Sequence, residues 1–312
     1  MGNDVGRAAM ADDGKRVGDV LARLSGAKKR YGDTTALDGL DLEVRQGELL
    51  AVLGPNGAGK TTAIALLLGL QRPDAGEALL FDRSPHDLAA RRGVGVMMQE
   101  VSLPDALRVR ELIAMTQAYY PDPLPLAEAI ALAGVEKIAE RPYIKLSGGQ
   151  KRQAQFALAI CGRPGLLFLD EPTTGLDLTS RETMWATLRG LVSRGISIVL
   201  TTHYIEEAEA LADRVVVMAK GRAIANGTVA EMRALVVRKR VDCVTDLDLA
   251  AIVAWPDVTT AHRDGGQVSI TTPDAEAVVR RLLAADAGLA DLEVRRAGLS
   301  EAFAELTQEP AQ

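Results

Sequence analysis

The segment Gly54–Thr61 carries residue types that bind a polyphosphate. Its sequence, Gly-Pro-Asn-Gly-Ala-Gly-Lys-Thr, fits the pattern G-x-x-x-x-G-K-[ST]. Glycines let backbone N–H groups approach a phosphate closely, and a helix that starts near Lys60 points its positive end at the same anion. We therefore expect Lys60 to reach the β- and γ-phosphates and the Thr61 hydroxyl to ligate Mg²⁺. The alternative is a glycine-rich turn before an ordinary core helix.

Two adjacent acids, Asp170 and Glu171, follow the short apolar run Gly165–Leu169. Carboxylates at the end of a buried strand are costly unless they interact with something. One acid at this point can hold Mg²⁺ through its hydration shell, and a second can orient or deprotonate a water molecule. The alternative is a strand end that is simply solvated.

Gln99 and His203 also follow predicted strands, Val94–Met98 and Ile196–Thr201. In open α/β sheets, ligands collect at the carboxyl ends of the strands. We therefore expect Gln99, His203 and the two acids to converge with the phosphate loop on one rim of the sheet. A lone histidine is more often structural, so the residue type alone leaves His203 open.

Two further features have two interpretations each. The Ser-Gly-Gly sequence at 147–149 precedes the predicted helix Lys151–Ile160. It is either a plain N-cap or a second anion site made of the serine hydroxyl and helix N–H groups.

Tyr31 is the only aromatic residue before the phosphate loop. Its ring either stacks on a nucleobase or belongs to the core.

The elements that must position these residues alternate between short apolar strands and helices, which predicts an α/β fold. The expected strands are Leu21–Tyr31, Leu40–Val44, Leu49–Leu53, Ala78–Phe81, Val94–Met98, Gly165–Leu169, Ile196–Thr201, Val215–Met218 and Ala223–Ala225. A turn is expected over residues 31–35. The expected helices are Thr62–Leu70, Leu107–Tyr120, Leu126–Gly134, Lys151–Ile160, Thr179–Arg194 and Glu206–Leu211.

The composition is that of an ordinary globular protein of one large or two modest domains, with 312 residues and a net charge of −6. That charge argues weakly against a nucleic-acid partner. The cysteines, Cys161 and Cys243, lie in apolar surroundings and are expected to be core residues in a reducing compartment. We expect no membrane span, because no apolar stretch reaches about 18 residues. Residues 1–20 are expected to be a disordered tail.

Taken together and in order, these residues resemble the ATP-binding subunits of ABC transporters over about residues 21–230. LSGGQ at 146–150 matches the signature that separates this family from other phosphate-loop proteins. The other matches are GPNGAGKTT at 54–62 (Walker A), LLFLDEP at 166–172 (Walker B with its glutamate), TGLD at 174–177 (D-loop), His203 (switch histidine), Gln99 (Q-loop) and Tyr31 in KRYGDTTAL (adenine-stacking aromatic).

The resemblance implies a phosphate-loop NTPase fold with an antiparallel β subdomain and a helical subdomain at about residues 100–160. It implies ATP and Mg²⁺ as cofactors, with Thr61 and Asp170 serving the metal, and Gln99 sensing the metal and the attacking water. Glu171 would polarise that water, and His203 would contact the γ-phosphate. The implied ATP-binding residues are Tyr31, Gly54, Pro55, Asn56, Gly57, Ala58, Gly59, Lys60, Thr61, Thr62, Ser147, Gly148, Gly149, Gln150 and Asp177.

The resemblance also implies that Ser147, Gly148 and Gly149 cap the γ-phosphate of the opposite subunit, so that two copies close head to tail over two ATP molecules. The chain would be a cytoplasmic ATPase, peripheral on the inner face of the cell membrane, that energises a separate permease exporting drug-like or lipid-like compounds. An alternative is a soluble ABC ATPase acting on ribosomes or DNA, but such proteins usually carry two cassettes or a long coiled-coil insertion. A phosphate-loop kinase would leave LSGGQ unexplained.

One departure from the family pattern is Arg108, where many relatives have a helix-capping threonine; we expect Asp105 to cap instead.

Residues 231–312 are expected to form a separate accessory domain. The elements expected there are Val241–Thr245, a helix to Trp255, Val258–His262, Gln267–Thr271, a helix Asp274–Asp286 and Leu292–Arg296. This β-α-β-β-α-β order predicts a ferredoxin-like domain, for dimer contacts or regulation, or as a stabilising appendage. Residues 295–307 resemble the tail of the drug, lipid and polysaccharide exporter branch, although Ser300 and Ala302 replace its usual acid and valine.

Overall fold

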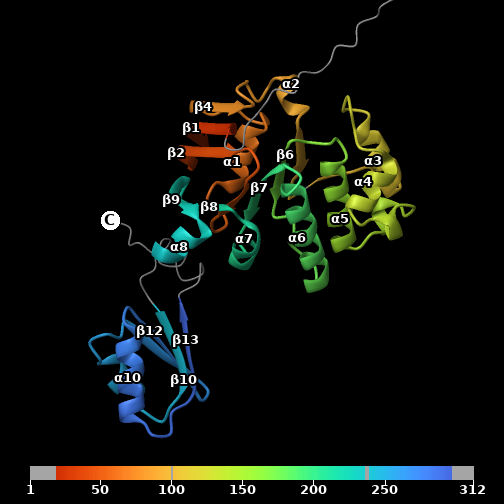
Figure 1. The fold of residues 1–312 in the computed structure, drawn as a ribbon. Coiled ribbons are helices and arrows are strands. Elements are labelled where there is room, and N and C mark those ends of the chain that lie inside the picture. The colour runs from red at the N-terminus through yellow and green to blue at the C-terminus, as the bar shows by residue number, and fades with distance from the viewer. Residues whose placement is uncertain (1–18, 100, 236–238, 297–312) are drawn as a thin grey trace, which may run out of the picture. The chain divides into compact units, whose positions relative to one another are not determined.

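The computed structural model describes residues 19–99, 101–235 and 239–296 (Figure 1). By their contacts, the residues form two compact units. The first contains residues up to Leu50, Gly59–Thr201 and Lys220–Arg222, and the second contains Ala51–Ala58, Thr202–Ala219 and the residues from Ala223 on. In the described part of the chain, no helix is both long and apolar enough to cross a bilayer. The domain limits 21–230 and 231–312 stay a prediction.

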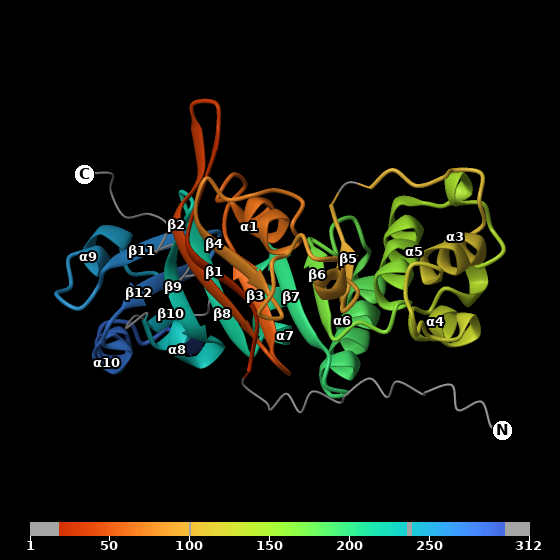
Figure 2. The ribbon, with the colours of Figure 1, turned by 90° about the horizontal axis from the view of Figure 1, so that it is seen from above.

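An antiparallel sheet with the order β2-β1-β4 belongs to the first unit. Its strands are β1 Val20–Tyr31, β2 Thr34–Arg45 and β4 Ala75–Leu80. The predicted turn over residues 31–35 is confirmed but is shorter than expected, because Tyr31 pairs directly with Thr34 and only Gly32 and Asp33 lie between the strands. Gly32 supplies the positive φ of 57° that so tight a hairpin needs, so the strands run to the very tip (Figure 2).

The main sheet has six strands in the order β5-β6-β7-β3-β8-β9. Its strands are β3 Leu49–Leu53, β5 Val94–Met97, β6 Leu166–Asp170, β7 Ser197–Thr202, β8 Arg214–Ala219 and β9 Arg222–Thr228. Strands β5, β6 and β7 are parallel neighbours. Every residue of β3, β6 and β7 is buried, as expected for parallel strands covered on both faces. The predicted α/β core is confirmed.

The helices along the core segments are α1 Lys60–Leu67, α2 Leu88–Arg91, α6 Leu178–Val192, α7 Ile205–Leu211 and α8 Val229–Leu235. Helix α1 starts at Lys60, where the phosphate-loop pattern predicted its start. Gly59 makes this possible, because it adopts φ 102° at the N-cap and its carbonyl oxygen accepts the N–H of Ala63. The lysine and the threonines of the phosphate loop therefore lie in the first turn of α1.

A helical subdomain, within the first unit, contains α3 Val109–Gln117, α4 Leu126–Leu132 and α5 Gly148–Ile160 (Figure 2). Two 3₁₀ turns, Glu136–Ile138 and Tyr143–Lys145, connect α4 to α5. The shared core includes Leu112, Ile113, Ala129, Ala154 and Ala157. It confirms the predicted helical subdomain.

The predicted cap of the first of these helices, Asp105, is wrong. Helix α3 begins two residues later than expected, with Arg108 as its N-cap. The Glu111 carboxylate accepts the Arg108 N–H at 2.8 Å. This is one of the two hydrogen bonds of a capping box, and it does not require an oxygen in the side chain of the N-cap residue. Asp105 instead uses its carbonyl oxygen, which accepts the N–H of Ile144 at 3.0 Å.

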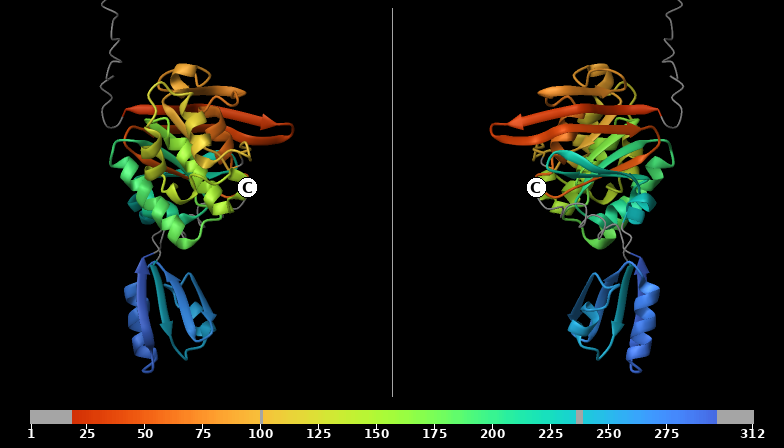
Figure 3. Two further views of the ribbon diagram at one scale, coloured as in Figure 1. Left: turned by 90° about the vertical axis from the view of Figure 1, so that its right-hand side faces the viewer. Right: turned by 90° about the vertical axis from the view of Figure 1, so that its left-hand side faces the viewer.

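The C-terminal sheet has the order β11-β12-β10-β13, with all neighbours antiparallel. The elements in chain order are β10 Lys239–Val244, α9 Leu249–Val253, β11 Thr260–Asp264, β12 Gln267–Thr272, α10 Ala275–Ala285 and β13 Ala290–Arg296. Helix α10 lies along this sheet (Figure 3). Its Val278 and Leu282 belong to one buried cluster with Val241 and Ile270 of the strands. The predicted β-α-β-β-α-β order is confirmed, whereas the exporter-type tail lies outside the described residues from 297 on.

The two cysteines are buried core residues, as predicted. Cys161 belongs to the helical core and Cys243 to the C-terminal core, and both are free thiols. Burial raises the pKa of the Cys161 thiol to about 11. The thiol is therefore protonated and unreactive at neutral pH.

Candidate active site

The centre of the site is the buried carboxylate of Asp170, the last residue of β6. The Thr61 hydroxyl in the first turn of α1 donates to its Oδ2 atom at 3.1 Å. The Thr201 hydroxyl, on the neighbouring strand β7, donates to its Oδ1 atom. The carboxylate and the Thr61 hydroxyl are the hard oxygen donors that Mg²⁺ prefers, so the residues present fit this metal.

Lys60 lies in the same group and is buried, with 6% of its surface exposed. Burial lowers the pKa of Lys60, and the carboxylates of Glu171 and Asp170 oppose that shift. A buried ammonium is expensive unless opposite charges compensate it, and these two carboxylates do so. The position of Lys60 beside Thr61 at the start of α1 fits a polyphosphate held by the lysine, the helix N-terminus and the loop.

Glu171 is buried and has a left-handed backbone, with φ 49°. Non-glycine residues rarely adopt this conformation, and it clusters at functional sites. Its N–H donates to the carbonyl oxygen of Thr201 at 3.0 Å. Its Oε2 atom accepts the Thr174 hydroxyl at 3.2 Å and the Gln99 side-chain amide at 3.5 Å. The turn after β6 therefore holds this carboxylate in one place, beside the first acid.

The predicted rim of strand ends forms within the first unit. Gln99 lies two residues beyond β5 and reaches Glu171, which lies one residue beyond β6. This brings together Lys60, Thr61, Gln99, Asp170 and Glu171, although they are far apart in the sequence. The predicted convergence of these residues is confirmed.

The start of the phosphate loop and His203 belong to the second unit. A Cβ added to Gly54 would lie 2.6 Å from the carbonyl oxygen of Met218, so only glycine fits there. Gly57 has φ 81°, which also favours glycine. His203 follows the last residue of β7, is exposed, and has its ring centroid 4.1 Å from that of Tyr204.

The LSGGQ segment forms the N-terminus of α5. The Ser147 hydroxyl accepts the Gln150 N–H at 3.3 Å, and the Gln150 side-chain oxygen accepts the Ser147 N–H at 3.2 Å. Ser147 is therefore an N-cap in a complete capping box, as one of its two interpretations predicted. A Cβ on Gly149 would lie 3.3 Å from the Leu176 side chain, whereas one on Gly148 would have no neighbour within 4 Å in the described part of the chain.

The remaining predicted residues have local partners. Asp177 caps α6, with its carboxylate accepting the Ser180 N–H at 2.8 Å and the Ser180 hydroxyl at 3.0 Å. These hydrogen bonds lower the pKa of Asp177. Tyr31 is 44% exposed, and its hydroxyl contacts the Gln71 side chain. The core interpretation of Tyr31 is therefore wrong, and its ring is available for stacking.

Two residues with a place in the site were not predicted from the sequence. Thr201 bridges Asp170 and Glu171, and Thr174 holds the Glu171 carboxylate. The signal for Thr201 was a hydroxyl at the end of the apolar run Ile198–Leu200. Its meaning depends on the register that places it opposite Asp170, which a single strand does not reveal.

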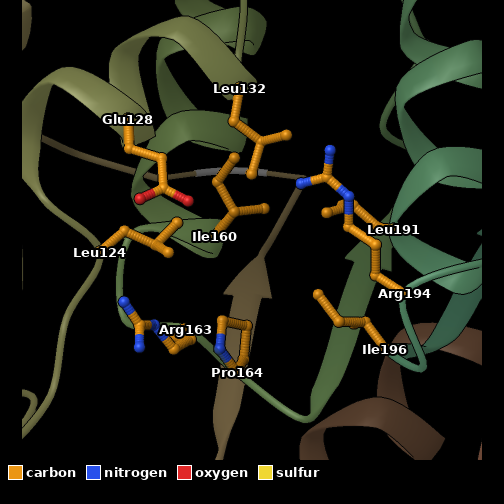
Figure 4. Close-up of a pocket in the computed structure, with 9 residues that line it drawn as sticks. All are labelled: Leu124, Glu128, Leu132, Ile160, Arg163, Pro164, Leu191, Arg194 and Ile196. Carbon is orange, nitrogen blue, oxygen red and sulfur yellow. The ribbon is translucent and has the colours of Figure 1, made fainter.

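The first unit also contains a cavity whose walls do not include Asp170 or Glu171. Its volume is about 220 Å³, and its walls are mainly the apolar side chains of Leu124, Leu132, Ile160, Leu191 and Ile196 (Figure 4). Its lining contains none of the predicted site residues. It is therefore not the nucleotide or metal site.

Comparisons with known proteins agree with this geometry. The model of the ABC transporter family matches residues 37–174. The daunorubicin resistance ATP-binding protein DrrA3 of Streptomyces coeruleorubidus is 38% identical over 93% of this chain and 96% of its own length. The Nod factor export ATP-binding protein I of Burkholderia orbicola is 44% identical over 64% of this chain and 68% of its own. A solved structure of the ATP-binding subunit of an ABC transporter covers 69% of this chain and 92% of its own, with a TM-score of 0.63 and 25% identity.

Proposed function

This chain belongs to the family of ABC transporter ATP-binding subunits, and we propose that two copies of it close head to tail over two ATP molecules. The chain is an ATPase that energises an exporter permease. Membership of this family rules out the phosphate-loop kinase. ATP hydrolysis rests on the buried group of Lys60, in the first turn of α1, with Asp170 and Glu171 at the end of β6. The observation that carries the head-to-tail arrangement is the accessible N-terminus of α5, where Ser147 and Gly148 are exposed.

Each residue of this group has one task. Lys60 and the N–H groups around it bind the β- and γ-phosphates of ATP, because the buried ammonium lies at the N-terminus of α1. Thr61 and Asp170 hold Mg²⁺, which neutralises charge on the phosphate oxygens when bound. Glu171 orients the attacking water and takes its proton, because its carboxylate is fixed by Thr174 and Gln99.

The other predicted contacts follow the same geometry. The phosphate loop from Gly54 to Gly59, with Thr62, surrounds the phosphates, and Tyr31 stacks on the adenine from its exposed position. His203 contacts the γ-phosphate at the end of β7. Gln99 links the metal and the water to the helical subdomain, because it lies between β5 and α3.

The second half of each site comes from the opposite copy. Ser147, Gly148, Gly149 and Gln150 start α5 with exposed or half-buried residues, so another molecule can reach the helix N-terminus. Among the residues that the structure describes, none lies where a Gly148 side chain would be. An approaching γ-phosphate explains why a side chain is absent there, since backbone N–H groups bind phosphate best without one.

The permease is a separate membrane subunit, and the ATPase lies on the cytoplasmic face of the membrane beside it. The exported compound is drug-like or lipid-like, in line with the names of the daunorubicin resistance and Nod factor export relatives.

A mixed dimer tests the head-to-tail arrangement. Lys60→Ala removes the phosphate-binding charge, and Ser147→Arg places bulk at the α5 N-terminus; Glu171→Gln in both chains traps bound ATP. Two different affinity tags isolate the mixed dimer. One of its sites carries both lesions and the other carries neither, so it should occlude one ATP, whereas each variant alone should occlude none.

The matched control for added bulk is Ala131→Arg, at an exposed position of α4 in the same helical subdomain. This variant alone should still occlude two ATP molecules per dimer. If each site were built within one chain, both sites of the mixed dimer would be damaged. A mixed dimer that occludes no ATP would therefore reject the head-to-tail arrangement.

A further inference from the structure

Thr201 is a buried hydroxyl in contact with both acids of the site. It is fully buried near the end of β7, and the parallel register places it opposite Asp170 on β6. Its hydroxyl donates to the Asp170 Oδ1 atom. The same oxygen accepts the Glu171 N–H at 3.2 Å, and the Thr201 carbonyl oxygen accepts that N–H at 3.0 Å.

These hydrogen bonds fix the orientation of the Thr201 hydroxyl. A hydroxyl has one proton to donate and two lone pairs to accept with. The Thr201 oxygen accepts the Glu171 N–H through one lone pair, and the Thr201 hydroxyl proton is directed to Asp170. Asp170 then has one oxygen bound by Thr201, and its other oxygen meets the Thr61 hydroxyl at 3.1 Å.

Strand packing does not require a hydroxyl at this position. The residues before it, Ile198, Val199 and Leu200, are apolar and fully buried, and a valine has nearly the shape of a threonine. A buried hydroxyl is costly unless it is hydrogen-bonded, so its presence here needs a reason. The side chain that accepts its proton is the carboxylate proposed to serve the metal.

We propose that Thr201 is a positioning residue for the metal site. It sets the rotation of the Asp170 carboxylate, so that one oxygen faces Thr61 and the metal. Through the Glu171 N–H it also stabilises the left-handed backbone that aims the second carboxylate. This inference rests on the proposed role of Asp170 in holding Mg²⁺, and it adds a residue of β7 that orders both acids together.

The test compares three variants of the full-length chain. Thr201→Val removes the hydroxyl with little change of shape, and Thr201→Ser keeps it. Ser197→Ala is the matched control, because Ser197 is also a fully buried hydroxyl of β7 but accepts the Gly47 N–H at 2.8 Å. Thr201→Ala is measured in the same way in case the valine variant does not fold.

The measured quantity is the affinity for Mn²⁺, followed by electron paramagnetic resonance in the presence of the β,γ-imido analogue of ATP. Thr201→Val should weaken Mn²⁺ binding by about 10–100-fold, the range found when a partner of a metal ligand is removed. Thr201→Ser should restore it to within about twofold, as expected if the hydroxyl is the group that acts. Binding of the analogue in EDTA should not change, and Ser197→Ala should lower the melting temperature but keep the parent Mn²⁺ affinity.

Parent-like Mn²⁺ affinity in Thr201→Val, or in Thr201→Ala, would overturn the inference. An equal loss in Ser197→Ala, or no recovery in Thr201→Ser, would do the same, since the effect would then belong to β7 in general. A parent protein that fails to bind Mn²⁺ with the nucleotide analogue would instead reject the proposed metal site itself. The two failures are therefore distinguishable.

Discussion

Replacing Glu171 with glutamine separates ATP binding from ATP hydrolysis. The amide has the size of the carboxylate, and its oxygen can still accept the Thr174 hydroxyl and the Gln99 amide that hold Glu171 Oε2 at 3.2 and 3.5 Å. The fold and the left-handed turn should therefore be kept. A neutral amide cannot take a proton from water, so the variant loses the general base alone.

The size of the effect follows from that single loss. A positioned general base contributes about 10²–10⁴-fold, which corresponds to about 3–5 kcal/mol of activation free energy. ATP binding should be unchanged or tighter, because one negative charge beside the phosphates is gone. The ATP-bound dimer should accumulate, because the slowed hydrolysis no longer removes the ATP that holds it closed.

Three measurements check this prediction. Phosphate release at saturating Mg-ATP gives the rate, a fluorescent nucleotide analogue gives the affinity, and size-exclusion chromatography gives the dimer. Glu77→Gln, which changes an exposed acid of β4 in the same way, is the control and should match the parent. Hydrolysis by Glu171→Gln at the parent rate would refute the role of Glu171, and loss of nucleotide binding would refute the claim that its turn is preserved.

Three more outcomes are expected. Tyr31→Ala should weaken ATP and GTP binding alike by about 1–3 kcal/mol in equilibrium titrations, because stacking uses the face of the base; an unchanged affinity would exclude stacking. Gly95→Ala should lower the free energy of unfolding, measured in urea, by about 1–3 kcal/mol, because the new Cβ would lie 2.0 Å from the Ala159 carbonyl oxygen. Gly190→Ala is the control and should raise the free energy of unfolding by about 0.5–1 kcal/mol, because Gly190 lies inside helix α6, where alanine is preferred to glycine. ATP affinity should fall as pH rises through the lowered pKa of Lys60, because the deprotonated amine no longer attracts phosphate, and Lys60→Arg should remove this fall.

The chemical core of the site was predictable from the sequence because it lies at the ends of strands buried on both faces. β3 and β6 each have five successive buried residues, and such runs are visible as apolar stretches. Glycines and a lysine directly after one such run, and paired acids at the end of another, are typical of a phosphate and metal site. The C-terminal order was predictable for a different reason, since apolar and polar residue types alternate along its strands, as Val268, Ser269 and Ile270 do in β12.

The remaining features depend on neighbours that the sequence does not show. The β1–β2 hairpin is longer than predicted because exposed residues near its tip are held by pairing, as between Tyr31 and Thr34. The cap of α3 was wrong because Glu111 supplies the hydrogen bond that was assigned to Asp105. The role of Thr201 required the β6–β7 register, and the left-handed backbone of Glu171 has no signal in the residue type.

Ser147 shows that two interpretations drawn from one residue type need not exclude each other. Its oxygen accepts the Gln150 N–H, which uses one lone pair and leaves the hydroxyl proton for another acceptor. A phosphate oxygen at the N-terminus of α5 is such an acceptor, and the helix dipole favours its charge. The capping box therefore orders the serine before any ligand arrives, and the same hydroxyl can donate to the γ-phosphate of an opposite copy. A residue that caps its own helix is in this way already oriented for the proposed head-to-tail site.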